Sequence, residues 1–173
     1  MTATSPVFPG GIRLFPATQK DIDYVEDNYR AGERHEREVE KAPPTCLSDF
    51  ETCWTVKASN GDIIGYFGIL VMPNESHMSR TRAFCFMSCE NANRHKIAFV
   101  KASRPVFAWG VSQCPKWTDR YLSWPLESYT GSVRWQERVL KMRRILMVPA
   151  ANGENYIVME LKRQEVEAWS EQR

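Results

Sequence analysis

The residues best placed to do chemistry lie in the stretch RAFCFMSCENANRHKIAFVKASRPVFAWGV, Arg82 to Val111. Its start, Arg82 to Ser88, is an apolar run with the length of a buried strand. The polar loop at 89–93 contains residues typical of a helix N-cap, and a long helix is predicted from about Asn93. Free N–H groups at a helix start form a candidate anion or phosphate site. Arg94, His95 and Lys96 add charge there. A basic turn that binds nothing is the alternative.

Thiol chemistry is the second candidate in this stretch. Cys85 and Cys89 lie four residues apart, and His95 is the nearest base in the sequence. A nucleophilic thiol needs such a base beside it. Nothing in the spacing brings the three together, so buried, inert cysteines are favoured.

Composition narrows the class of protein. The chain has 173 residues, 43% hydrophobic and 25% charged, with a net charge of +2. This balance gives no electrostatic case for nucleic acid or membrane binding. The five cysteines are odd in number and lack CxxC spacing, and no signal peptide or membrane span is found. We therefore expect a cytosolic, reduced protein. The three scattered histidines predict no metal site.

The flanking sequence predicts the elements that hold this stretch. Residues 1–11 are expected to be flexible, and a strand at 12–15 precedes a helix with Thr18 as N-cap and Asp21 in the capping box. A mixed-charge helix at 33–41 is expected to be solvated. The other predictions are hairpin strands at 52–58 and 62–71 around Asn60-Gly61, a strand at 120–126, a helix from 130 or 132 to 142, hairpin strands at 143–148 and 156–161, and a charged tail at 164–173. Pro105 predicts a kink in the long helix, or its division into two helices.

This order of elements resembles that of the GNAT acetyltransferase superfamily. The resemblance starts with IRLFPATQKDIDYVEDNY, Ile12 to Tyr29, and includes the Asn60-Gly61 hairpin and the strand, loop and long helix of Arg82 to Val111. It implies a single α/β (α+β) domain over residues 12–163, with a mixed, mostly antiparallel sheet of six to seven strands flanked by helices. A closer resemblance to small GNAT-like proteins of short-tailed bacteriophages is carried by CWTV at 53–56, FCFM at 84–87 and the aromatic segment 121–135.

The resemblance implies acetyl-CoA as cofactor and assigns roles to particular residues. Tyr129 is the implied general acid on the CoA thiolate, and Glu90 is the implied general base, with Glu75 as the other nearby carboxylate. The implied cofactor-binding residues are Met87, Ser88, Cys89, Asn93, Arg94, His95 and Lys96. The sequence departs from the family in two respects. Tyr129 precedes the last helix, and Trp135 stands in that helix where a smaller or polar residue is expected, so a packed or surface Tyr129 is the alternative to a general acid. In addition, residues 89–98, CENANRHKIA, contain no glycine where enzymes of the family close on pyrophosphate.

Three functions follow from this departure. The favoured one is a binding protein that contacts a host bacterial protein or a virion protein, in the host cytoplasm or in the virion, through aromatic anchors. Those anchors are Trp109, Trp117, Tyr121 and Trp124. The alternatives are an active N-acetyltransferase and an acyl-CoA-regulated binder. A homodimer is a further expectation. Nucleic-acid binding is disfavoured, and its single candidate surface is Arg134, Arg138, Lys141, Arg143 and Arg144.

Overall fold

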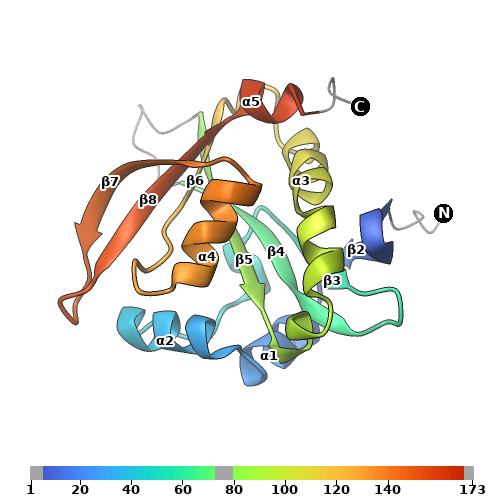
Figure 1. The fold of residues 1–173 in the computed structure, drawn as a ribbon, viewed down its shortest axis with the longest axis horizontal. Coiled ribbons are helices and arrows are strands. Elements are labelled where there is room, and N and C mark those ends of the chain that lie inside the picture. The colour runs from blue at the N-terminus through green and yellow to red at the C-terminus, as the bar shows by residue number, and fades with distance from the viewer. Residues whose placement is uncertain (1–5, 73–79, 170–173) are drawn as a thin grey trace.

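One eight-stranded sheet organises the chain in the computed structural model, which describes residues 6–72 and 80–169 (Figure 1). The strand order is β1-β2-β3-β4-β5-β6-β8-β7. The strands are β1 (Val7–Phe8), β2 (Ile12–Pro16), β3 (Thr52–Lys57), β4 (Ile63–Val71), β5 (Thr81–Ser88), β6 (Arg120–Ser123), β7 (Arg143–Pro149) and β8 (Asn155–Lys162). The helices are α1 (Gln19–Asp27), α2 (Ala31–Glu40), α3 (Lys96–Gln113), α4 (Thr130–Arg134), which continues as a π-helix (Trp135–Val139), and α5 (Arg163–Glu167).

The pairing of β5 with β6 is the feature that shapes the molecule. All other neighbouring strands pair antiparallel, whereas β5 and β6 are parallel and pair only over Thr81–Ala83 and Arg120–Leu122. On its other edge β5 pairs with β4 as far as Ser88. Beyond Ala83, therefore, the β6-facing edge of β5 has no strand partner among the described residues.

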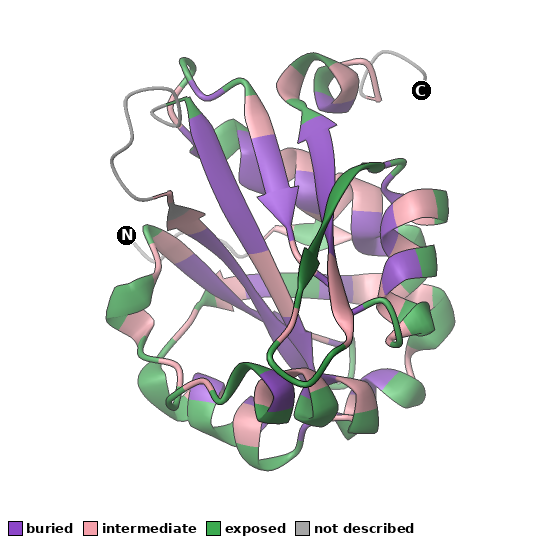
Figure 2. Cartoon of the chain, turned by 90° about the vertical axis from the view of Figure 1, so that its left-hand side faces the viewer, coloured by how far each residue is buried: buried purple, intermediate pink, exposed green. Residues whose placement is uncertain are grey.

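The two faces of the sheet carry separate apolar clusters. Successive residues of a strand point to opposite faces, so Tyr66 of β4 joins a cluster with Ile22 and Val25 of α1, while Phe67 joins the larger cluster under α3. Figure 2 shows the resulting buried strands between more exposed helices. Gly110 of α3 allows close packing, because a Cβ there would lie 2.4 Å from the Phe67 ring.

Several predicted elements are confirmed. Thr18 caps α1, its hydroxyl accepting from the Asp21 N–H, while the Asp21 carboxylate accepts from the Thr18 N–H. Both hairpins form, with Gly61 and Gly153 at positive φ in their turns. The mixed, mostly antiparallel α/β sheet flanked by helices is also confirmed.

Other predictions need correction. The sheet has eight strands instead of six or seven, because Val7–Phe8, expected to be flexible, pairs with β2. The charged tail includes the short helix α5, and its Val166 is buried in the core. The helix expected from about Asn93 begins at Lys96 and runs unbroken through Pro105. Ile97, an apolar residue in its first turn, is 75% exposed.

Candidate functional site

A cavity of about 780 Å³ opens where β5 and β6 diverge. Its walls come from widely separated parts of the chain, so no single motif defines it. They include Phe84–Ser88 of β5, part of β4, the segment Ser123–Pro125 after β6, one face of α2, parts of 43–50, the start of α3, α4 and the π-helix. Most lining side chains are apolar, and the charged ones are concentrated on α2.

The cavity-facing side of α2 carries Glu33, Glu36, Arg37 and Glu40. Residues three and four apart lie on one face of a helix, which explains why this set points the same way. The prediction of a wholly solvated helix is therefore wrong for this face. Carboxylates recur at 33, 36 and 40, and this spacing indicates in the sequence that they share one helix face. The mixed charges of the residues between them make the pattern hard to recognise.

Glu33 is the most buried carboxylate of the cavity, with 4% of the residue exposed. Its Oε2 accepts a hydrogen bond of 2.8 Å from the Tyr129 hydroxyl. Its Oε1 accepts from both the backbone N–H and the hydroxyl of Ser88, and that hydroxyl also accepts from Arg30 at 3.2 Å. A buried carboxylate requires such partners, so Glu33 is a fixed part of the wall.

Gly32 brings Tyr129 against α2. A Cβ at residue 32 would lie 2.2 Å from Cε2 of the Tyr129 ring, which is far inside van der Waals contact. Only glycine therefore permits this approach without displacement. The ring sits at the start of α4, where Tyr129 is the N-cap residue, and its hydroxyl reaches Glu33 across the cavity wall.

Glu36 differs from Glu33 in how few partners it has. Its Oε1 accepts a 2.8 Å hydrogen bond from the Leu126 backbone N–H, and its Oε2 has no hydrogen-bond or ion-pair partner among the described residues. Burial and, to a lesser degree, the charges of Glu33 and Glu40 raise the pKa of Glu36 to about 7, against the opposing effect of the Leu126 N–H. A carboxylate with this pKa exchanges protons near neutral pH.

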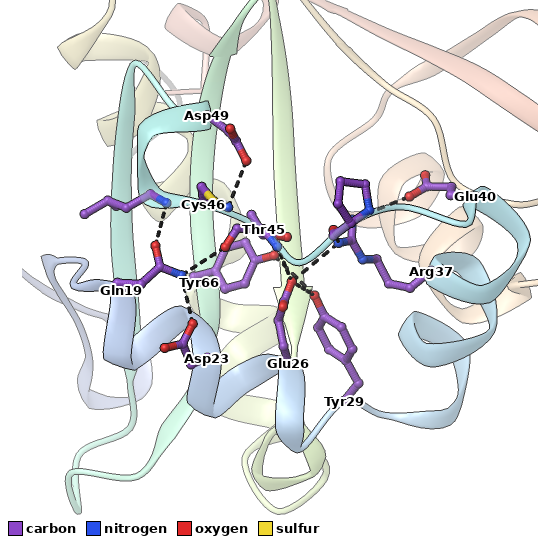
Figure 3. Close-up of polar contacts among 12 residues, drawn as sticks. Gln19, Asp23, Glu26, Tyr29, Arg37, Glu40, Thr45, Cys46, Asp49 and Tyr66 are labelled. Atoms are coloured by element: carbon purple, nitrogen blue, oxygen red, sulfur yellow. Dashed lines mark hydrogen bonds and ion pairs between the residues drawn. The ribbon is translucent and has the colours of Figure 1, made fainter.

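The segment 43–49 closes another side of the cavity, and polar contacts tie it to α1 (Figure 3). Gln19 donates to the Thr45 carbonyl at 3.0 Å and accepts from the Leu47 N–H at 2.8 Å. Glu26 accepts from the Thr45 N–H at 3.1 Å and from the Tyr29 hydroxyl at 3.1 Å. Arg37 lies 3.6 Å from Glu26 and 3.7 Å from Glu40, so its charge is compensated.

The predicted cofactor-binding residues divide into two groups. Met87, Ser88 and Lys96 line the cavity. Cys89, Asn93, Arg94 and His95 do not line it. The buried Cys89 thiol donates to the Ile63 carbonyl, and His95 lies 3.1 Å from Asp62. Asn93 and Arg94 are exposed beside the start of α3. The cofactor-binding role of these seven residues stays a prediction.

The loop between β5 and α3 does not need glycine for its own conformation. Residues 90–93 form a 3-10 turn, and no residue between 89 and 95 has a positive φ. The N–H groups of Ala92, Arg94 and His95 donate within this turn, at 2.9 to 3.2 Å. Those amides are unavailable to an anion, which leaves the first amides of α3 for that task.

The predicted acid and base receive different placements. Tyr129 lines the cavity, whereas Glu90 is exposed in the 3-10 turn and does not. The role of Glu90 as general base stays a prediction; its backbone N–H donates to the Asn28 carbonyl at 3.0 Å. Glu75 lies outside the described residues. Glu33 and Glu36 are carboxylates that line the cavity together with Tyr129.

The cysteines of the site are not activated. Cys85 lines the cavity, and burial raises the pKa of its thiol. Burial also raises the pKa of Cys89. His95 is paired with Asp62 and hydrogen-bonds neither thiol. The favoured prediction of inert cysteines agrees with this geometry.

Three aromatic rings form one flank of the cavity. Phe86, Phe99 and Trp135 lie with ring centroids 4.8 to 5.6 Å apart, and the Trp135 indole N–H donates to Ser103 at 2.9 Å. They come from β5, α3 and the π-helix, so this cluster connects three elements. It was not predicted, because the three residues are separated by up to 49 positions (135 − 86) in the sequence.

The aromatic segment expected to bind a partner does not form one surface. Tyr121 is buried, Trp109 packs edge-on against Trp54, and Trp124 lines the cavity. Of these four residues, Trp117 is half exposed. The Arg82 guanidinium lies over its ring. The predicted basic surface is also reduced, since Arg143 binds Glu160 and Arg144 binds Glu137.

The described residues contain neither a metal-ligand cluster nor a membrane-spanning helix. No group of three or more histidines, cysteines or carboxylates there is arranged to hold a metal ion. None of the described helices combines the length and apolar character that crossing a membrane requires.

Comparison with known proteins finds solved structures that share this architecture. No protein-family model matches the sequence, and no curated protein matches it. An N-acetyltransferase from Staphylococcus aureus Mu50 matches with a TM-score of 0.65 and 11% identity, over 88% of this chain and 98% of its own. A spermidine N-acetyltransferase from Vibrio cholerae, in complex with CoA and spermine, matches with a TM-score of 0.63 and 8% identity, over 90% and 98%.

A GCN5-related N-acetyltransferase from Kribbella flavida matches with a TM-score of 0.57 and 14% identity, over 87% of this chain and 97% of its own. These three proteins are bacterial, so the closer resemblance to bacteriophage proteins stays a prediction. The identities are low, and the shared property is the arrangement of strands and helices. The chain has the fold of the GNAT N-acetyltransferases.

Proposed function

We propose that this protein transfers an acyl group from an acyl-CoA, with acetyl-CoA as the first candidate, to an amine bound in the cavity. The observation that carries the proposal is the divergence of β5 from β6, with the cavity between them. The fold supports it as well, since the Vibrio cholerae protein of this fold is seen with CoA and spermine. This gives preference to the enzyme over the binding protein favoured by the sequence.

The free edge of β5 suits the extended part of such a cofactor. Backbone groups of an unpaired strand edge hydrogen-bond an extended chain that carries amides. Residues Phe84–Ser88 line the cavity along this edge. The cavity-lining residues of β5 therefore fit the extended, amide-bearing part of an acyl-CoA.

The start of α3 suits the phosphates. Arg94 and Lys96 flank the helix N-terminus, and their side chains make no hydrogen bond or ion pair among the described residues. Their charges and the first amides of an 18-residue helix favour an anion. Bound there, the cofactor supplies an acyl group activated as a thioester.

Tyr129 has a different role from the predicted general acid. Its hydroxyl proton is donated to Glu33, and burial raises the pKa of Tyr129. The proton is thus held by the protein, and the oxygen lone pairs remain as acceptors. Tyr129 orients the amine, while Phe86, Phe99 and Trp135 exclude water from that flank.

Titration calorimetry with acetyl-CoA tests the cofactor site. The wild-type protein is expected to bind at micromolar concentrations, and the double variant Arg94→Ala/Lys96→Ala at least tenfold more weakly, because two phosphate-facing charges are removed. The double variant Lys101→Ala/Lys116→Ala is the matched control, since both lysines are exposed and lie outside the cavity. Absence of binding by the wild type, or equal weakening in the control, would contradict the assignment.

A further inference from the structure

We propose that α2 is a lid over the cavity, held closed by contacts of Glu33, His35 and Glu36 that are firmest in acid and release the helix as the pH rises through neutrality. We call these three contacts the latch. The proposal goes beyond the proposed function, because it concerns access to the cavity and requires no acyl donor. It rests on how little apolar packing holds α2, on where the latch contacts end and on which of them titrate.

Apolar packing contributes little to the position of α2. Among its ten residues, Val39 is the single buried apolar one, and the other buried residue is Glu33. The neighbouring helix α1, in contrast, buries Ile22 and Val25 completely. Segments with few buried apolar contacts open locally while the rest of a protein stays folded. We therefore expect α2 to open before the sheet unfolds.

Two latch contacts join α2 to the segment that follows β6. The Tyr129 hydroxyl donates to Glu33 Oε2 at 2.8 Å, and the Leu126 N–H donates to Glu36 Oε1 at 2.8 Å. Both contacts break if α2 moves away from this segment. Tyr129 then loses the carboxylate that accepts its hydroxyl proton. Closure of the lid and the fixed position of Tyr129 in the cavity wall therefore belong to one state.

The third latch contact joins α2 to the turn between β7 and β8, which lies at the same end of the molecule (Figure 1). His35 Nε2 lies 2.8 Å from Glu154 Oε1. Ser128 and Asn152 also donate to the Glu154 carboxylate, so it is held in place for His35. The contact is an ion pair only when His35 is protonated. Because histidine is the side chain that changes charge around neutral pH, this contact is stronger in acid.

Glu36 gives the latch the same pH dependence. Its carboxylate has one hydrogen-bond partner among the described residues, the Leu126 N–H. Burial, with the charges of Glu33 and Glu40, raises the pKa of Glu36 to about 7. Opening the lid removes this burial, so the pKa of Glu36 falls toward its ordinary 4.5. The closed lid thus binds the proton more tightly, and it loses stability relative to the open lid as the pH rises from 4.5 to 7.

The other groups around this carboxylate leave that direction unchanged. Arg37 lies 3.6 Å from Glu26 and 3.7 Å from Glu40, so its charge is compensated. Arg30 donates to the Ser88 hydroxyl at 3.2 Å. On the other elements, burial raises the pKa of each titratable group near this wall, which keeps these groups uncharged at neutral pH. They are Cys85 of β5, Tyr129 before α4 and Tyr156 of β8.

Amide hydrogen exchange, followed by mass spectrometry, tests the lid. Exchange of the peptide 31–40, divided by the intrinsic rate at each pH, gives its opening constant. We expect this constant to rise by about tenfold or more between pH 5.5 and pH 7.5, while that of α3 stays level. Most of the rise is expected to disappear in Glu36→Gln. Glu38→Gln is the matched control and should follow the wild type, because Glu38 is an exposed carboxylate of the same helix that does not line the cavity.

Glu154→Gln tests the latch from outside α2. It leaves the sequence of the helix unchanged and removes the charge that pairs with His35. The opening constant of 31–40 is expected to rise by about twofold or more at pH 5.5, since an exposed ion pair stabilises weakly. The effect at pH 7.5 is expected to be smaller, because the pair then loses its charge on His35.

Thiol labelling shows whether this opening gives access to the cavity. Cys85 lines the cavity, whereas Cys46 is exposed and supplies a reference rate within the same molecule. At pH 7.5, N-ethylmaleimide is expected to modify Cys85 in Glu36→Gln about threefold or more slowly than in the wild type, relative to Cys46. Loss of the Glu36 charge by itself would favour the Cys85 thiolate, so slower modification reports a closed lid.

Three results would overturn the proposal. One is an opening constant of 31–40 that stays level with pH in the wild type. Another is a rise in Glu36→Gln as steep as in the wild type. The third is equal modification of Cys85 in these two proteins. All of these measurements are made without acyl-CoA, so their outcome is independent of the acetyl-CoA titration that tests the proposed function.

Discussion

Glu36 is the residue whose properties depend most on its surroundings. Its pKa is raised to about 7 from an ordinary 4.5, chiefly by burial. The titratable groups whose charges interact with it are Glu33, Glu40, Cys85, Tyr129 and Tyr156. A carboxylate that is hard to ionise in the folded state lowers stability wherever it must be charged. Retaining it in the cavity wall is consistent with a role in binding rather than in folding.

This raised pKa predicts a pH-dependent stability difference between the wild type and Glu36→Gln. Below about pH 4.5 the carboxyl is protonated in both folded and unfolded states, so the difference is small. As the pH rises toward 7 the unfolded state releases the proton first, so the wild type loses stability relative to the variant. Above about 7 the difference reaches a plateau, on the order of 1–3 kcal/mol in favour of the variant.

Urea unfolding of both proteins between pH 4.5 and pH 8.5 measures this difference. Glu38→Gln serves as control, and its difference from the wild type is expected to stay level across that range. A level difference for Glu36→Gln would show that Glu36 ionises normally in the folded protein.

The sequence could point to Tyr129 but not to its partner. The Glu33–Tyr129 contact joins residues 96 positions apart. Gly32, which permits the contact, looks in the sequence like a helix break and instead lies inside α2. Side-chain sites of this kind depend on tertiary packing, which local patterns do not encode. Glu90 lies in the loop between β5 and α3, which makes it a candidate in the sequence, but its side chain is exposed in the 3-10 turn.

At the scale of elements, local signals were sufficient where the chain turns tightly. The Thr18 capping box and the Asn60-Gly61 turn depend on neighbouring residues, so they could be predicted from the sequence. The exposure of individual side chains along α3 could not be predicted from the sequence. Ile97 and Val100 follow a buried-stripe pattern, but this end of the helix faces the cavity and solvent instead of the core.

The exposed apolar side chains of edge strand β7 indicate that the protein self-associates. The strand lies at the edge of the sheet, and Ile145, Leu146, Met147 and Val148 are 41–50% exposed. A long apolar edge is a site for strand pairing. Antiparallel pairing with a second copy about a two-fold axis would satisfy both edges. It would also put the Arg143–Arg144 pairs of the two copies at opposite ends. We therefore expect a homodimer through β7.

Sedimentation velocity tests this dimer. The wild type is expected to sediment as a dimer at tens of micromolar, and Met147→Lys as a monomer, because a charge at the edge opposes pairing. Val7→Lys, on the two-residue strand at the opposite edge of the sheet, is the matched control and should remain dimeric. A monomeric wild type, or a dimeric Met147→Lys, would exclude β7 as the interface.

At the scale of the whole molecule, one departure from regular sheet structure creates the site. β5 and β6 begin as a parallel pair and separate after three residues, while β4 on one side and β8 on the other keep each strand in place. The cavity fills the separation and is lined by α2, segment 43–49 and the start of α3. Acidic side chains of α2 and Lys96 of α3 thus border the same cavity.

Formation of the N-acylated amine is the measurement that tests this most directly. Purified protein is incubated with acetyl-CoA and hexylamine at pH 8, and N-acetylhexylamine is quantified by mass spectrometry. We predict product at roughly 1 s⁻¹ or faster, with loss of at least tenfold at low acetyl-CoA concentration in Arg94→Ala/Lys96→Ala and no loss in Lys101→Ala/Lys116→Ala. No product above the uncatalysed background, from protein that is folded and supplied with both substrates, would contradict an acyltransferase acting on an amine in this cavity.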